Sequence, residues 1–596
     1  MTHTAERLAA LREQMRAAGC DALVVPRADE YLGEYIPAHN ERLRWLSGFT
    51  GSAGLALVTA TRAAIFVDGR YTVQVRQEVS ADEFEYCRLG DDLHADWLAA
   101  QLQRRGVVAC DARMHSLRWY RDTAAALAAA GMQLVSTASN LVDACWRDRP
   151  VPRLSPALLL AEHYTGESSA AKRRRIGAAV AAKGADAALV FAPDSISWLL
   201  NIRGTDIPKL PVVQGLALLA ADGQLTLLAE PGRIPAGFAD HVGAGVTVLP
   251  ETGSAAVLAG YRGRRVLADP DTANAWSQLA LEQGGAVLLA GADPVLLPKA
   301  CKNAVELQGT RNAHIRDAVA EIRFLAWLDG EVDAGRLHTE DELAERLLAF
   351  RARGEHFREV SFDSISAAGA NAAMCHYNHL NVATPARLPM DSVYLIDSGG
   401  QYLDGTTDIT RTVAIGDPGA DIRRLFTLVL KGHIALDQAR FPVGTTGSQL
   451  DILARQFLWQ EGFDYDHGTG HGVGVFLSVH EGPQRIAKAP NTTALQPGMI
   501  VSNEPGYYRD GGFGIRCENL VVVRESPRAG PERAMLEFEA ITLVPFDLRL
   551  VDTALMSAAE LAWLDSYHRR VATEIGPLLD DPERQWLANA TRPLLA

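Results

Sequence analysis

Short apolar runs and amphipathic segments alternate along the first part of the chain. The first 19 residues place Leu8, Leu11, Met15 and Ala18 on one face of a predicted helix. An apolar run at residues 23–25 follows, with the length and composition of a buried strand. A helix, a short buried strand, another helix and further strands are the order typical of an α/β domain.

The same pattern returns in the following part of the chain. Three features recur: a Gly-x-Asp-Ala sequence near an apolar run, a tryptophan six residues before a glycine, and the sequence GLAL. They lie at residues 19–22 and 184–187, at Trp45 and Trp198, and at 54–57 and 215–218. We therefore predict two related α/β domains within the first 300 residues.

Two breaks divide the chain. Proline interrupts regular structure, and it is dense at residues 149–153 and again around 294–302. Beyond the second break, Ile315, Val319, Ile322 and Ala326 recur at helical spacing. Residues 390–545 are rich in β-branched runs broken by glycine turns, and a polar helical tail covers about 552–596. We expect domains at 1–150, 151–300 and 301–596.

Charge and composition narrow the classes of partner. The chain has 58 Lys and Arg against 72 Asp and Glu, a formal charge of −14, which argues against nucleic acid. The basic run at 172–175 (KRRR) lies in a helical pattern and is interpreted as a solvated face. The sequence contains no long uncharged apolar stretch, so we predict no membrane-spanning helix. Seven scattered cysteines without a Cys-x-x-Cys pair favour a reducing, cytoplasmic location.

Acidic residues stand at the ends of predicted strands in the third region. Asp397 ends the apolar run VYLID, and Asp408 lies in the sequence DITRT, where strand alternation places it on one face with Thr410 and Thr412. Glycines between them would allow a hairpin or meander that brings both carboxylates together. Glu504 follows another apolar strand, and Glu518 precedes NLVVV. Each acid alone would be more simply explained as a cap, a turn former or an ion-pair partner.

Taken together, these acids predict a metal site. A buried carboxylate without a partner costs several kcal/mol, and Arg411 or Arg516 could neutralise only one of them. The glycine-rich sequence HGTGHGVG adds His467 and His471. Four carboxylates with His471 form an oxygen-rich set that suits a pair of Mn²⁺-like ions, about 3.5–4 Å apart when carboxylates bridge them. On spacing alone, His376, His467 and His480 are weaker candidates.

These motifs, LIDSG, DGTTDITRT, HGTGHGVG, HEGP, NEPGYY and GIRCENL, resemble the metal-dependent Xaa-Pro aminopeptidases (aminopeptidase P). The family's catalytic domain has the pita-bread fold shared with prolidase, methionine aminopeptidase and creatinase. RWLSGFTGSAG, FVDGRY and SWLLNIRGTDIPKLPV resemble the two domains that precede it. The resemblance implies two creatinase-like α/β domains, an α+β pita-bread catalytic domain, and a C-terminal extension from about residue 545 that is typical of the long form.

The resemblance also implies roles. Asp408 and Glu518 would bridge two metal ions, Asp397 would complete one site, and His471 and Glu504 the other. A metal-bridging hydroxide would attack the carbonyl before proline, with Glu504 as general base or proton shuttle. The remaining roles fall on residues around the ions: His480 would stabilise the tetrahedral intermediate, His376 and His467 would line the proline side, and Arg516 would orient a carboxylate. Strand alternation directs Cys517 away from Glu518 and into the core.

The implied protein is a peptidase for peptides with proline at the second position. Its cofactors would be two divalent ions, with Mn²⁺ as the first choice and Zn²⁺ or Co²⁺ as alternatives. We expect the protein to be a cytoplasmic homodimer that binds neither membranes nor nucleic acid. A prolidase shares the same ligands, but the duplicated front half favours the aminopeptidase. An inactive peptide-binding relative would be expected to have lost ligands, and methionine aminopeptidase needs none of the first 300 residues.

Overall fold

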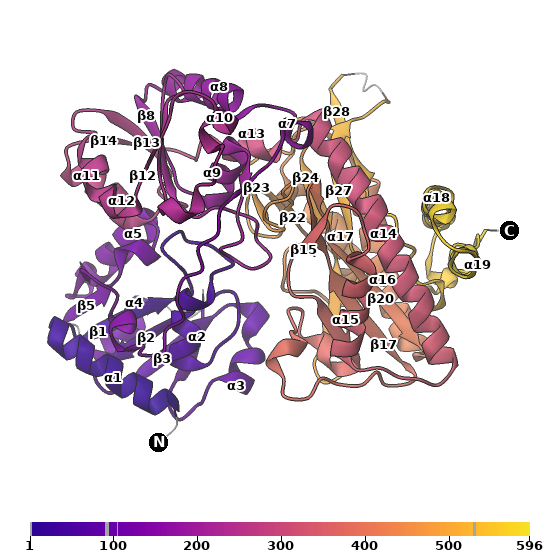
Figure 1. Cartoon of the computed structure of the whole chain (residues 1–596). Helices are drawn as coiled ribbons and strands as arrows, with labels where there is room; N and C mark the ends of the chain where they lie inside the picture. The colour runs from indigo at the N-terminus through magenta and orange to yellow at the C-terminus, as the bar shows by residue number, and fades with distance from the viewer. Residues whose placement is uncertain (1–2, 90–93, 104, 529–531, 596) are drawn as a thin grey trace. The chain divides into compact units, whose positions relative to one another are not determined.

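A computed structural model describes residues 3–89, 94–103, 105–528 and 532–595. The chain forms two compact units (Figure 1). The first comprises Met1–Leu160 and Glu167–Leu296, and the second comprises Ala161–Gly166 and Leu297–Ala596. The observed architecture of α/β sheets followed by a mixed helix and sheet unit agrees with the predicted fold class.

The first unit contains two six-stranded sheets with the same topology. The first has the order β4-β3-β2-β1-β5-β6 and the second the order β12-β11-β10-β8-β13-β14. In each, the central strand pairs antiparallel on one side and parallel on the other, at equivalent places in the two orders. The strands of the first sheet are β1 (Ala22–Pro26), β2 (Leu55–Thr59), β3 (Ala63–Val67), β4 (Glu85–Arg88), β5 (Val107–Cys110) and β6 (Gln133–Ser136). Those of the second are β8 (Ala187–Val190), β10 (Leu216–Ala220), β11 (Leu225–Leu228), β12 (Val246–Leu249), β13 (Arg265–Ala268) and β14 (Val287–Ala290).

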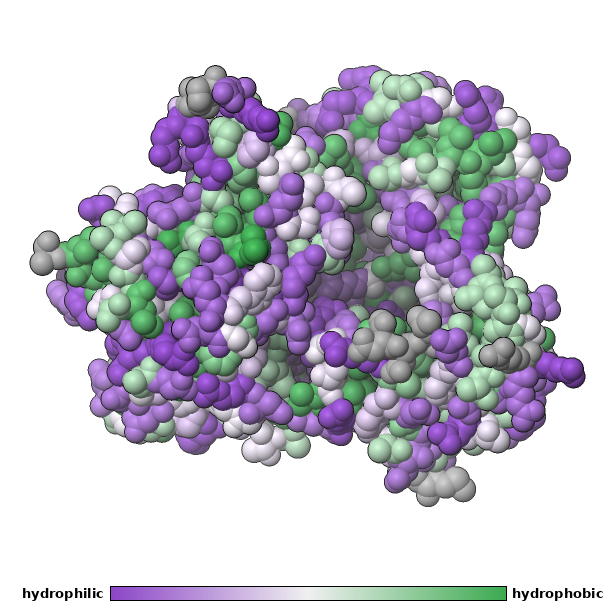
Figure 2. Space-filling model, turned by 180° about the vertical axis from the view of Figure 1, so that it is seen from behind, coloured by the Kyte–Doolittle hydropathy of each residue, from purple (hydrophilic) through white to green (hydrophobic). Residues whose placement is uncertain are grey.

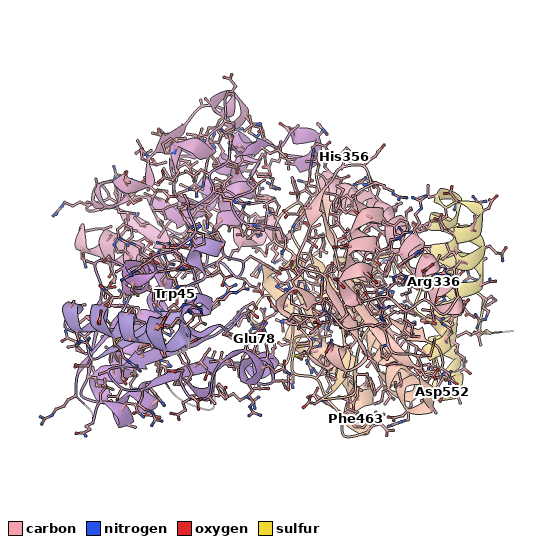
Figure 3. All side chains as sticks on the ribbon, turned by 60° about the horizontal axis from the view of Figure 1, so that its bottom comes forward. Trp45, Glu78, Arg336, His356, Phe463 and Asp552 are labelled. Atoms are coloured by element: carbon pink, nitrogen blue, oxygen red, sulfur yellow. The ribbon has the colours of Figure 1, made fainter. Side chains whose placement is uncertain are left out.

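This shared topology confirms the predicted repeat. Helix α1 (His3–Ala18) buries Leu8, Leu11 and Met15, as its periodicity predicts. Trp45, labelled in Figure 3, lies in the core of the first copy. Its ring stacks on that of Trp146 with centroids 5.6 Å apart.

The interpretation of residues 172–175 as a solvated face is wrong for half of the run. The residues lie in α8 (Ser169–Ala182), where Lys172 and Arg173 are buried while Arg174 and Arg175 are exposed. Lys172 Nζ donates to the carbonyl of Trp198 at 3.0 Å and to Asn201 Oδ1 at 2.8 Å. Carbonyl oxygens satisfy Arg173 in the same way, so both cations are buried with partners.

The second unit packs long helices on antiparallel sheets (Figure 1). Its helices include α14 (Ala304–Asp333), α15 (Glu340–Arg351), α16 (Gly419–Asp437) and α17 (Gly447–Gln460). One sheet has the order β16-β17-β20, with β16 (Ile365–Ala368), β17 (Ser392–Ser398) and β20 (Ile409–Ile415). Another has the order β21-β28-β27-β24-β22-β23, with β21 (Arg440–Pro442), β22 (Gly470–Gly472), β23 (Glu481–Ile486), β24 (Ile500–Asn503), β27 (Asn519–Glu525) and β28 (Met535–Ala540).

In this unit the six-stranded sheet forms an apolar cluster with α17, while a larger apolar core joins α14, α15, α16, β17 and β20 to the C-terminal tail. Phe324 of α14, Tyr394 of β17 and Leu425 of α16 are buried in it, and Phe463 packs against its edge (Figure 3). The predicted tail forms α18 (Ala558–Ile575) and α19 (Asp581–Ala590), which contribute buried leucines to the same core. Cys517 belongs to this core at 1% exposure, as expected.

The surface is mixed in character. Figure 2 shows polar residues interspersed with small apolar groups on the face it presents. Among the residues that the structure describes, no helix combines the length and apolar character needed to cross a membrane.

Candidate metal centre

Two neighbouring strands carry the first pair of predicted acids. Asp397 lies in β17, directly opposite Thr410 of the antiparallel strand β20, and Asp408 precedes β20. The predicted pairing of these strands is confirmed. Their connection is longer than a simple turn, because it passes through β18 (Gly400–Tyr402) and β19 (Gly405–Thr406), which belong to a different sheet.

The other predicted ligands come from the six-stranded sheet. His471 lies in β22, and Glu504 directly follows β24. Glu518 lies between β26 (Phe513–Arg516) and β27. Asn503 pairs with Asn519 across β24 and β27, which brings the two glutamates to the same end of adjacent strands. The backbone N–H of Glu518 donates to the carbonyl of Thr410 at 3.3 Å, so the two sheets meet at this point.

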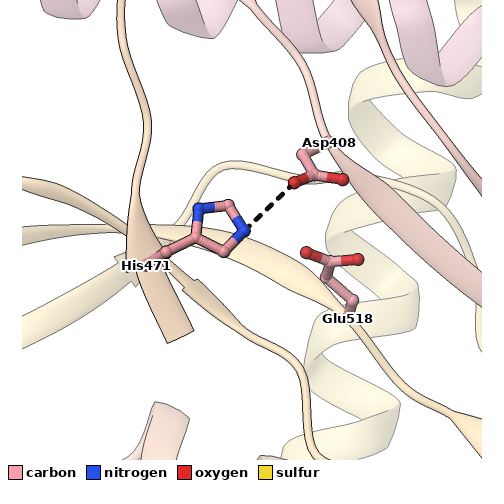
Figure 4. Close-up of side chains that lie close together, drawn as sticks. All are labelled: Asp408, His471 and Glu518. Carbon is pink, nitrogen blue, oxygen red and sulfur yellow. Dashed lines mark ion pairs between the residues drawn. The ribbon is translucent and has the colours of Figure 1, made fainter. Parts of the chain in front are cut away.

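Three of these side chains converge from separate segments. Asp408, His471 and Glu518 each offer a ligand atom within 4.8 Å of the others (Figure 4). His471 Nε2 lies 3.4 Å from Asp408 Oδ2 and 3.5 Å from Glu504 Oε1, which joins Glu504 to the group. His471 Nδ1 is 2.8 Å from the carbonyl of Gly472. Since a carbonyl only accepts, Nδ1 carries a proton, and Nε2 faces the carboxylates, which is the orientation of a metal-binding imidazole.

Asp397 is held by Arg516. Arg516 Nη2 donates to Asp397 Oδ2 at 2.6 Å, and its Nε donates to Thr410 Oγ1 at 3.1 Å. Thr410 Oγ1 in turn donates to Glu518 Oε2 at 2.6 Å. The other oxygen of Asp397, Oδ1, is buried and has no hydrogen-bond partner among the described residues.

Burial and crowding of like charges perturb the acids. Burial raises the pKa of Asp397 to about 7; Arg516 opposes this shift, and the carboxylates of Asp408 and Glu504 add to it. Burial, followed by its carboxylate neighbours, raises the pKa of Glu518 well above the ordinary value. Burial alone would lower the pKa of His471, but Asp408 and Glu504 raise it to about 9. Such a cluster has excess negative charge that divalent cations would neutralise, and its oxygen-rich donors with one imidazole suit such ions.

The predicted histidines lie at different distances from this group. The ring of His480 is centred 4.4 Å from that of His471. His467 Nδ1 is 4.0 Å from Glu504 Oε2, and its Nε2 hydrogen-bonds to the hydroxyl of Tyr508 at 2.7 Å. His376 lies in a turn outside the three-residue group. It follows Cys375, whose carbonyl accepts from Arg516 Nη1 at 3.3 Å.

Sequence reasoning missed Tyr508. It lies in β25 (Gly506–Arg509), and its hydroxyl contacts both His467 Nε2 and Arg516 Nη1, each at 2.7 Å. It therefore links the predicted proline-side histidine to the arginine that holds Asp397. The available signal was its place in NEPGYY, four residues after Glu504.

Known proteins match along the whole chain. The metallopeptidase family M24 model matches residues 308–525, and a model for the C-terminal region of that peptidase family matches 534–594. Two models of the creatinase/prolidase N-terminal domain match 7–145 and 148–306.

Individual relatives agree with these models. Aminopeptidase P1 of Arabidopsis thaliana is 37% identical, with 99% of each chain covered. A probable Xaa-Pro aminopeptidase P of Tuber melanosporum is 38% identical, again over 99% of each chain. The crystal structure of an X-prolyl aminopeptidase from Caenorhabditis elegans, described as a cytosolic enzyme with a di-nuclear active site, matches with a TM-score of 0.96 and 34% identity over 100% of both chains. With such relatives matched from end to end, the chain belongs to the Xaa-Pro aminopeptidase (aminopeptidase P) family of M24 metallopeptidases.

Proposed function

We propose that this protein is a metal-dependent aminopeptidase that hydrolyses the N-terminal Xaa-Pro bond of peptides. The observation that carries the proposal is the convergence of buried Asp408 and Glu518 with half-buried His471 in a chain that matches Xaa-Pro aminopeptidases over its full length. A metallopeptidase needs such a group, whereas a binding protein gains nothing from burying carboxylates beside one another.

The proposed ligands are the five residues named from the sequence: Asp397, Asp408, His471, Glu504 and Glu518. Their fit to cations rests on the oxygen-rich donors, the orphaned Oδ1 of Asp397 and the raised pKa of Glu518. Two divalent ions would supply a Lewis acid and a nucleophile at neutral pH. A di-nuclear site in the Caenorhabditis elegans relative supports two ions, and we propose Mn²⁺, with Zn²⁺ or Co²⁺ as alternatives.

We assign proton transfer, oxyanion stabilisation and ligand orientation to three side chains. Glu504 accepts a hydrogen bond from Ser502 Oγ at 3.0 Å and lies beside His471, where it would receive and pass on a proton. His480 is proposed to donate to the oxyanion that forms on the scissile carbonyl. Arg516 would orient Asp397 through the 2.6 Å bond described above.

Proline explains the need for a dedicated enzyme. The Xaa-Pro bond has no N–H, so a peptidase that grips this hydrogen cannot hold the substrate. We propose that His376 and His467 line the proline side, with the hydroxyl of Tyr508 fixing the ring of His467.

The wider organisation is also proposed. The division into domains 1–150, 151–300 and 301–596, with an extension from about 545, is supported by the two repeated sheets and by the family models. A cytoplasmic location is supported by the relative described as cytosolic. We also propose a homodimer with contacts through the front domains, and sedimentation as a monomer at micromolar concentration would contradict it.

The test is a digest of an Xaa-Pro-Yaa tripeptide and an Xaa-Pro dipeptide with Mn²⁺, read by mass spectrometry. We expect the tripeptide to release its first residue and the dipeptide to remain intact. Cleavage of the dipeptide alone would identify a prolidase and refute the proposal.

A further inference from the structure

A buried histidine lies behind the candidate metal centre. His433, on α16, is 0% exposed. Its Nδ1 is 3.0 Å from the carbonyl oxygen of Asn503 and 3.2 Å from that of Cys517. The residues that follow these two carbonyls are Glu504 and Glu518. One imidazole nitrogen therefore touches the backbone directly before each glutamate.

The surroundings of the ring fix its protonation. Both neighbours of Nδ1 are carbonyl oxygens, which only accept, so Nδ1 carries a hydrogen and donates to both. Nε2 is buried without a hydrogen-bond partner among the described residues, and the rings of Phe546 and Trp563 stand 5.2 and 6.0 Å away by their centroids. Burial, and then the charge of Arg411, lowers the pKa of His433 to about 3, so the ring is neutral at working pH.

Each peptide plane before a glutamate is held at both polar ends. His433 donates to the two carbonyl oxygens, and the two N–H groups donate to backbone carbonyls of other segments. Glu504 N donates to the carbonyl of Thr469 at 2.8 Å, and Glu518 N to that of Thr410 at 3.3 Å. Asn503 Nδ2 also donates to the carbonyl of His433 at 2.9 Å, which makes the link to α16 reciprocal.

We propose that His433 is a positioning residue that sets the separation of the Glu504 and Glu518 backbones, and through it the geometry in which both carboxylates meet the metal ions. The inference rests on the proposed two-metal function. A histidine that only filled space would need no acceptor at Nδ1, and a phenylalanine would fill the same volume without leaving Nε2 buried and unpaired.

Three substitutions separate positioning from packing. His433→Asn puts an amide N–H near the place of Nδ1, His433→Gln puts the same group near the place of Nε2, and His433→Phe keeps a ring without any N–H. For each variant we would measure the number and affinity of bound Mn²⁺ by calorimetry in a competing chelator. The electron paramagnetic resonance spectrum of the loaded protein reports the coupling between the two ions.

We expect His433→Asn to stay within about threefold of the wild-type affinity with an unchanged spectrum. The Gln and Phe variants should bind at least one ion about 10–100-fold more weakly, the range seen when outer-shell partners are lost, and should show an altered coupling. Wild-type affinity and spectrum in both would overturn the inference, as would an Asn variant that behaves like Gln or fails to fold.

The comparison remains decisive if the Phe variant does not fold, because Asn and Gln carry the same amide and the extra methylene of Gln moves it away from the place of Nδ1. The wild-type protein separates the two hypotheses. If it binds no pair of Mn²⁺ ions, the proposed function fails; if it binds the pair and the variants do not differ, only the role of His433 fails.

Discussion

Replacing Arg516 with lysine tests whether a fork of donors, rather than a charge, holds the centre together. The guanidinium is 2% exposed and donates to Asp397, Thr410, Tyr508 and the carbonyl of Cys375. A lysine ammonium keeps the charge but cannot reproduce the planar fork. We assume that the lysine retains the shortest of these bonds, the 2.6 Å contact to Asp397.

Three hydrogen bonds would then be lost. At about 1.5 kcal/mol for each hydrogen bond from a charged donor, the free energy of unfolding should fall by about 4.5 kcal/mol. The orientation of Asp397 would also loosen, because Tyr508 and Thr410 no longer fix the cation that holds it. By analogy with other outer-shell partners of metal sites, Mn²⁺ affinity should fall about 10–100-fold.

Urea unfolding of the metal-free protein and chelator-buffered Mn²⁺ titration measure the two effects separately. The matched control is Arg524→Lys on β27, an exposed arginine paired with Glu537, which should leave both quantities within error. An Arg516→Lys variant that binds two ions with wild-type affinity would refute the positioning role assigned to this residue.

Three further changes test separate parts of the account. Asp408→Asn should abolish binding of at least one metal ion, measured by elemental analysis, and reduce peptidase activity at least about 100-fold in a peptide assay. Two retained ions with normal turnover would disprove the role of Asp408 as a bridge. Burial raises the pKa of Asp437 to about 6, so ionisation of this carboxyl destabilises the folded state as the pH rises from about 4 through 6. In thermal unfolding, Asp437→Asn should therefore be more stable than wild type at pH 8 and show little gain at pH 4. An equal gain in stability at both pH values would contradict this. Lys172→Met should destabilise the protein by about 2–3 kcal/mol because it leaves the Trp198 carbonyl without its donor, whereas Arg174→Met on the exposed side should change unfolding by less than about 0.5 kcal/mol.

The repeat was predictable because buried strands leave apolar runs in the sequence. The matching GLAL sequences at 54–57 and 215–218 fall on β2 and β10, which occupy the same place in the two sheets. The sequence also located the acids, since Asp397 and Glu504 end apolar strands where an unpaired carboxylate is costly.

Other features depend on contacts that local pattern does not carry. Arg173 is buried because the carbonyls of Gly223, Val242 and Ala244 receive its guanidinium, and all three lie far along the chain. From helical spacing alone, all four residues of the basic run at 172–175 could lie on a solvated face, so the sequence did not separate the buried pair from the exposed pair. His433 was missed for the same reason, because it lies on the buried face of an amphipathic helix and its hydrogen-bond acceptors come from other segments of the chain.

The central claim is that five side chains from two sheets hold a pair of divalent cations, and anomalous diffraction from crystals grown with Mn²⁺ tests it most directly. We expect two peaks about 3.5–4 Å apart, with Asp408 and Glu518 contacting both, Asp397 contacting one, and His471 and Glu504 the other. A single peak, or a pair of peaks away from these residues, would contradict the account.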